Sequence, residues 1–125
     1  MENVTIKQVE DIVSVLTEEQ QQLLKDTITH GKWGDADMEF LDKDGNIETD
    51  SMFGYCTNDA KNAGHFNGRK ISAMFRSMYK KLCPANNNQV GEYISHCNDW
   101  WGDGSGDMLF IRGEYVEAFE EWSRQ

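Results

Sequence analysis

Several features that would assign this chain to a class at once are scarce or missing. It has one proline, three cysteines and no apolar run near the 18 residues that a membrane-spanning helix needs. Cys56, Cys83 and Cys97 are an odd number without paired spacing, which favours reduced thiols over a disulfide framework or a zinc site. The N-terminus lacks the basic start and apolar core of a secretion signal. These absences predict a cytoplasmic protein with no membrane partner.

The length and the aromatic content predict one folded domain over residues 1–125. A chain of 125 residues suits a single core, and 11% of its residues are aromatic. Aromatic side chains bury large areas, so the acidity of the chain does not make it disordered.

Charge is distributed unevenly along the chain. Acidic residues outnumber basic ones by 22 to 12, which gives a formal net charge of -10. Residues 60–91 nevertheless contain no acid and hold six basic residues, Lys61, Arg69, Lys70, Arg76, Lys80 and Lys81. Charge segregation bears on partners rather than on fold. The window predicts recognition of an anion, or docking onto the acidic N-terminal half of this chain or of a second copy in a homodimer; the alternative is an ordinary solvent-exposed face of an amphipathic helix.

No spacing in the sequence selects a catalytic pair, a catalytic triad or a phosphate-binding loop, which predicts a non-enzymatic protein without a cofactor. The stretch "LDKDGNIE" is similar to a calcium loop. Aligning Gly45 with the glycine of such a loop puts Phe40 at its first position and Ser51 at its twelfth, where ligands are required. We therefore predict no metal site. His65 and His96 are predicted to be surface residues.

The first half of the chain predicts two helices and a β-hairpin. Apolar residues recur at helical spacing from Ile6 to Leu16, with Thr5 as a possible cap. Thr17 opens "TEEQ", a capping box, and a second helix should stop at Gly31, although one longer helix through Thr17 remains an alternative. Residues 33–55 alternate with period two around "KDGN", which is a hairpin signal.

The second half predicts a helix pair, a second hairpin and a last helix. Residues 57–64 indicate a short helix, and residues 67–82 a longer one, capped by Asn67 and ended before Pro84. Its apolar stripe consists of Ile71, Met74, Phe75, Met78, Tyr79 and Leu82. Residues 93–112 predict a hairpin with its tip at 102–106, and residues 115–122 a C-terminal helix.

This order of elements resembles the winged-helix superfamily of DNA-binding domains over residues 17–122. "NDAKNAGHFNGRKISAMFRSMYKKL" is similar to the helix-turn-helix, and "EYISHCNDWWGDGSGDMLFIRG" to the β-hairpin wing. The resemblance implies an α+β fold with a basic recognition-type helix. The chain departs from the family in two places. The hairpin around Asp44 and Gly45 is long, and the wing carries Asp99, Asp103 and Asp107 but no basic residue before Arg112.

A regulatory protein that binds a DNA duplex is the first functional hypothesis, and it follows from this resemblance and the basic helix. Arginine and asparagine make bidentate base contacts, whereas lysine positions the phosphate backbone. The expected nucleic-acid-binding residues are Asn67, Arg69, Lys70, Ser72, Ala73, Arg76, Lys80 and Lys81.

The second hypothesis is an acidic interaction protein that binds a basic partner protein, for example as an inhibitor that imitates DNA. Small accessory proteins of mobile elements have this composition. Trp100 and Trp101 are adjacent, so in a strand one should be buried and the other exposed as an interface anchor. The expected interaction residues are Asp35, Asp37, Glu39, Asp42, Asp44 and Trp101.

Overall fold

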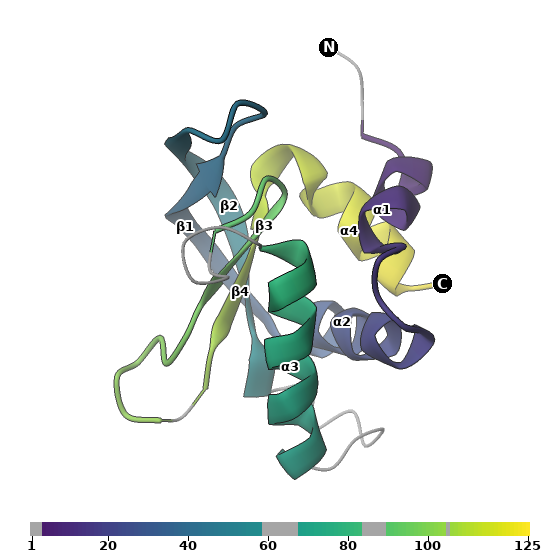
Figure 1. The fold of residues 1–125 in the computed structure, drawn as a ribbon, viewed down its shortest axis with the longest axis vertical. Helices are drawn as coiled ribbons and strands as arrows, with labels where there is room; N and C mark the ends of the chain where they lie inside the picture. Colours follow the sequence, from purple (N-terminus) through teal and green to yellow (C-terminus); the bar gives the residue numbers. More distant parts are fainter. Residues whose placement is uncertain (1–3, 59–67, 84–89, 105) are drawn as a thin grey trace.

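The computed structural model describes residues 4–58, 68–83, 90–104 and 106–125, without the side chains of residues 68–70 and 72. The described chain is an α+β fold in which helices pack against an antiparallel sheet (Figure 1). Among these residues no helix combines the length and the apolar character needed to cross a membrane. The elements are α1 (Ile6–Val13), α2 (Glu18–His30), β1 (Lys32–Leu41), β2 (Ile47–Cys56), α3 (Gly68–Leu82), β3 (Ile94–Cys97), β4 (Met108–Arg112), the 3-10 helix η3 (Gly113–Tyr115) and α4 (Val116–Ser123).

A capping box starts each of the first two helices, and the second box separates α2 from α1. The hydroxyl of Thr5 accepts the N–H of Gln8, and the side chain of Gln8 accepts the N–H of Thr5. Thr17 and Gln20 repeat this exchange at the start of α2. Each box satisfies main-chain donors that the first helical turn leaves unpaired. The predicted caps Thr5 and Thr17 are confirmed, and the alternative of one longer helix through Thr17 is wrong.

The sheet has the order β1-β2-β4-β3, with every neighbouring pair antiparallel. β1 and β2 form the hairpin predicted around Asp44 and Gly45. In its turn the carboxylate of Asp42 accepts the N–H groups of Asp44 and Asn46, at 2.9 Å each. These bonds, led by the one from Asn46, lower the pKa of Asp42 below its ordinary value. The residues that are similar to a calcium loop thus close a hairpin turn.

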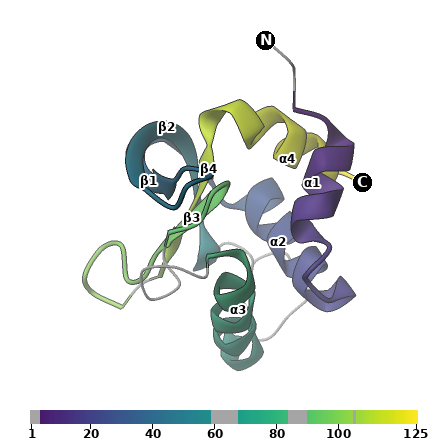
Figure 2. The same ribbon diagram turned by 45° about the horizontal axis from the view of Figure 1, so that its top comes forward.

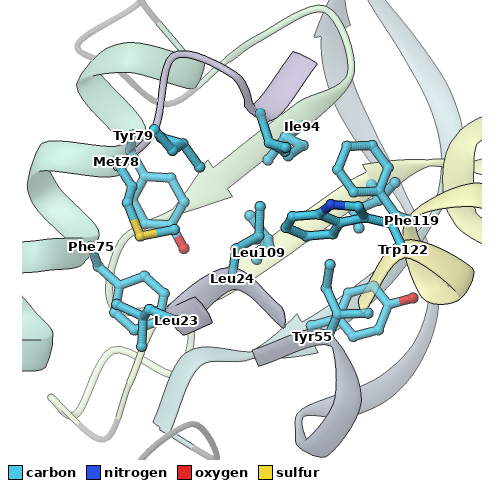
Figure 3. Packing of buried hydrophobic residues seen from close by; sticks show 14 of the residues in the cluster. Leu23, Leu24, Tyr55, Phe75, Met78, Tyr79, Ile94, Leu109, Phe119 and Trp122 are labelled. Atoms are coloured by element: carbon cyan, nitrogen blue, oxygen red, sulfur yellow. The ribbon is translucent and has the colours of Figure 1, made fainter. Parts of the chain in front are cut away.

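One face of the sheet carries the main core. Tyr55, Ile94, Leu109 and Ile111 from β2, β3 and β4 pack against residues of α1, α2, α3 and α4. Figure 3 shows members of this core from α2, α3 and α4 around Tyr55, Ile94 and Leu109. The apolar stripe of α3 faces this core as predicted, with its first five residues buried and Leu82 packed at the edge. Burying such side chains stabilises the fold by about 1.5–3 kcal/mol each.

The other face of the sheet rolls around a second, smaller core (Figure 2). This core contains Phe40, Met52, Cys56, Met108 and Phe110, with Ala36, Met38 and Cys97 packed against it. The outer strands approach each other, because the N–H of Leu41 at the end of β1 donates to the carbonyl of Gly91 just before β3, at 3.0 Å. The sheet therefore covers its second face with its own hairpin instead of with helices.

Arg112 covers one end of the rolled sheet. Its guanidinium lies 4.9 Å from the centre of the Phe40 ring and pairs with the carboxylates of Glu48 and Asp50. The same group donates to the carbonyl of Leu41 at 3.2 Å. Two of the chain's many acids are in this way neutralised within the fold.

The β3–β4 hairpin agrees with the prediction for residues 93–112. Gly102, Gly104 and Gly106 near its tip all have positive φ, which glycine adopts without steric cost. The helix predicted at residues 57–64 lies outside the described residues except for its first two positions. The helix-turn-helix angle that the winged-helix resemblance implies therefore falls outside the described chain.

Candidate functional site

Half of the expected nucleic-acid-binding residues can be placed in full. Asn67 and the side chains of Arg69, Lys70 and Ser72 lie outside what the structure describes. The other four lie on the exposed side of α3, opposite its buried stripe, and are Ala73, Arg76, Lys80 and Lys81.

One flank of α3 is used for packing within the molecule. Lys81 Nζ donates to the side-chain oxygen of Gln20 at 2.8 Å. The amide nitrogen of Gln20 in turn donates to Ser77 at 2.9 Å. The flank toward the start of α2 thus takes part in internal hydrogen bonds. The cationic face that points away from this contact consists, in its described part, of Arg76 and Lys80.

The opposite flank of α3 faces carboxylates. A cavity of about 450 Å³ lies between α3 and the loop that joins β3 to β4, called here the β3–β4 loop. Arg76 lines it from the helix, and Asp99 and Asp107 line it from the loop. Like charges within a Debye length of about 10 Å repel each other, so these carboxylates oppose the approach of a phosphate to Arg76.

Asp107 organises the β3–β4 loop. One of its carboxylate oxygens accepts the N–H of Asp99 at 2.9 Å, and the other lies 3.0 Å from His96 Nε2. Its main chain exchanges hydrogen bonds with Thr57. Asp99 continues the network by accepting the N–H of Gly104 at 2.7 Å. The bond from His96 is the main cause of a lowered pKa at Asp107. The loop is therefore held by its own carboxylates.

His96 is buried, so its prediction as a surface residue is wrong. Its ring stacks on Tyr79 of α3, with centroids 3.7 Å apart and planes 12° apart. The side chain alternates onto the helix-facing side of β3, where Asp107 supplies its polar partner. Among the described residues, no three histidine, cysteine or acidic side chains are grouped to hold a metal ion.

The three cysteines form no disulfide bond in the structure, and all three lie among its described residues. Cys83 is buried beneath the end of α3, where its thiol donates to the carbonyl of Ile94 at 3.2 Å. Burial raises the pKa of Cys83 to about 12, which keeps the thiol protonated and unreactive at neutral pH.

Three tryptophans are exposed together, and they are called here the tryptophan surface. Trp33, Trp100 and Trp101 have exposed fractions of 62%, 39% and 38%. Trp33 and Trp101 meet edge to face with centroids 5.5 Å apart, and Trp100 contacts Phe110 at 5.1 Å. The prediction that one of the adjacent pair is buried is wrong, because β3 ends at Cys97 and both tryptophans lie in the following turn.

Trp33 was absent from the predicted site, although the sequence contains a signal for it. The tripeptide Trp-Gly-Asp occurs twice, at residues 33–35 and 101–103. The fold brings the tryptophans of the two copies into contact, since Trp33 at the start of β1 meets Trp101 in the β3–β4 loop.

The predicted acidic residues are spread along β1 and the turn that follows it. Asp35, Asp37 and Glu39 are exposed at alternate positions, about 7 Å apart, beginning two residues after Trp33. Asp42 and Asp44 lie in the turn at the far end, roughly 30 Å along the strand from Trp33. Of these acids only Asp35 lies close to Trp33 along the strand, because Glu39 is roughly 20 Å from Trp33 and only about 10 Å from Asp42.

Comparisons with models of protein families, with curated proteins and with solved structures give no match for this chain.

Proposed function

We propose that the chain is a non-enzymatic interaction protein that binds a basic partner protein through the tryptophan surface and the exposed acids of β1. The observation that carries this proposal is the exposed contact between Trp33 and Trp101, which come from distant parts of the sequence. Tryptophan is the residue most typical of binding hot spots, and clustered exposed apolar side chains mark interaction sites.

The charge beside the tryptophan surface selects the partner. Asp35, Asp37 and Glu39 follow Trp33 along β1, and Asp99 and Asp103 flank the other two tryptophans in sequence. A surface of aromatic rings bordered by carboxylates suits lysine and arginine, which pair with carboxylates and also bind the faces of aromatic rings. The net charge of -10 adds long-range attraction toward a basic protein.

Removing one ring of the contact tests the proposal. Once a partner has been captured and purified, Trp101→Ala should weaken its binding by 2 kcal/mol or more, about 30-fold, as hot-spot truncations do. The matched control is Val15→Ala, because Val15 is also an exposed apolar residue, 56% exposed, but follows α1. Equal affinities of Trp101→Ala and the wild type, measured by calorimetry, would remove the tryptophan surface from the interface.

DNA binding by α3 is a second candidate, and the exposure of Arg76 and Lys80 on a helix without acids favours it. If α3 reads a duplex, Arg76→Ala should weaken specific binding by about 1–3 kcal/mol. Lys80→Ala should weaken binding to all sequences alike and lower the salt slope by about one unit. No mobility shift on any duplex at low salt would exclude this candidate. We rank DNA binding second because the carboxylates beside Arg76 oppose the approach of a phosphate.

A further inference from the structure

A groove lies between the β1–β2 hairpin and the start of α4, on the face of the hairpin that carries Phe53. It has a volume of about 480 Å³. Phe53 of β2 and Val116 of α4 supply half-buried apolar lining, and Asp35 and Asp37 of β1 supply carboxylates. Among the described residues, neither carboxylate has an ion-pair partner, whereas Glu48 and Asp50 of β2 pair with Arg112.

The molecule itself shows how a cation binds beside this groove. Lys32 Nζ lies 5.0 Å from the centre of the Phe53 ring and 3.5 Å from the carboxylate of Glu120. An aromatic ring below and a carboxylate at the side are the two groups that hold a lysine head at a protein surface. Phe53 also lines the groove, with Asp35 opposite it in the register of β1 and β2 and Asp37 opposite Ser51.

We propose that this groove receives a lysine or arginine side chain of the basic partner, with its aliphatic stem on Phe53 and Val116 and its charged head between Asp35 and Asp37. The inference rests on the proposed function and adds a specificity pocket to it. Charge complementarity decides the occupant, because an apolar side chain would desolvate two carboxylates without pairing them. The tryptophan surface would supply affinity, and the groove would require a cationic residue at one position of the partner.

The probe is the blocked peptide acetyl-Gly-Arg-Gly-amide, titrated into the full ¹⁵N-labelled chain. Its matched control replaces arginine with citrulline, which has nearly the same shape but no charge. We expect the arginine peptide to shift the amide signals of Asp35, Asp37, Phe53 and Val116, and the citrulline peptide to leave them in place. Equal shifts with both peptides, or shifts confined to the tryptophan surface, would overturn the groove assignment.

Variants separate this site from the neighbouring acids. Asp37→Asn should weaken arginine-peptide binding about two- to fivefold, the range for an exposed ion pair. Glu39→Gln is the matched control, since Glu39 stands next in the same row but does not line the groove, and it should change binding less than Asp37→Asn. Ser51→Trp places a bulky ring at an exposed strand position in the lining and should block binding. Unchanged binding in both Asp37→Asn and Ser51→Trp contradicts the proposal.

The two proposals fail in different ways. If the peptide misses the groove while Trp101→Ala still weakens partner binding as predicted, the groove assignment is wrong and the proposed function stands. If the groove binds the arginine peptide but Trp101→Ala leaves partner binding intact, the tryptophan surface is wrong and the cation pocket remains.

Discussion

At the scale of the residue, Asp107 links the core to the β3–β4 loop that carries Trp100 and Trp101. Its carboxylate faces His96 on one side and the N–H of Asp99 on the other. His96 in turn stacks on Tyr79 of α3. A substitution at Asp107 should therefore alter both the packing of α3 and the conformation of the β3–β4 loop.

Asp107→Asn should destabilise the protein by about 1–3 kcal/mol at neutral pH, because it weakens a hydrogen bond to a charged group. The pKa of Asp107 is lowered from 3.8 in the folded protein, so its contribution is complete above that pH and is lost as pH falls through the lower folded value. Thermal unfolding of both proteins should thus show a stability difference that shrinks below pH 4. A constant difference would contradict this account, and Asp37→Asn serves as the exposed control.

At single residues, the sequence did not suffice to predict which side chains are buried and which are exposed. The period-two pattern continues through Trp100 and Trp101, but the chain leaves the sheet at Cys97, because Asp99 adopts a positive φ and starts a turn. His96 looked like a surface residue because its partner, Asp107, is eleven residues away across the hairpin. Such contacts depend on strand register, which composition and spacing do not supply.

At the scale of the element, local patterns predicted most of the secondary structure. The apolar stripe of α3, both capping boxes and the Asp-Gly turn act within a few residues, so they can be read directly. The roll of the sheet could not be read this way. It depends on how Phe40 and Phe110, which are far apart in the sequence, share one small core.

Two glycines that face each other across β1 and β2 test the rolled sheet. A Cβ at Gly54 would come within 2.9 Å of Met108 and 3.0 Å of Phe110, whereas one at Gly34 would meet nothing within 4 Å. Gly54→Val should therefore overpack the small core and cost about 1–3 kcal/mol in unfolding free energy. Gly34→Val should be neutral or slightly stabilising, as a β-branched residue in a strand. Similar losses in denaturant unfolding of both variants would show that the sheet is not closed around this core.

At the scale of the whole molecule, the exposed acids of β1 and the exposed cations of α3 lie beside different strands of the sheet. β1 is one outer strand, and α3 packs beside the other, β3, through Tyr79 and His96. The charge window visible in the sequence thus separates α3 from the acids of β1, but the sequence alone did not show that Asp99 and Asp107 of the β3–β4 loop line a cavity with Arg76.

Partner binding should weaken as salt rises from 50 to 500 mM, because exposed carboxylates attract the partner through solvent. Replacing Asp35, Asp37 and Glu39 together by their amides should flatten this dependence, whereas Glu10→Gln on α1 should preserve it. Calorimetric titrations at several salt concentrations measure the slope. An unchanged slope in the triple variant would assign the attraction to other acids.

Photo-crosslinking from defined positions tests the central claim most directly. A benzoylphenylalanine placed at Trp101, at Lys80 on α3 or at Val15 after α1 reports what touches each surface in the cell. We predict that position 101 yields a crosslink to one basic protein, that the purified partner binds Trp101→Ala about 30-fold or more weakly than the wild type, and that positions 80 and 15 yield none. Nuclease-sensitive crosslinks from position 80, with none from position 101, would contradict the account and establish α3 as a DNA-binding helix.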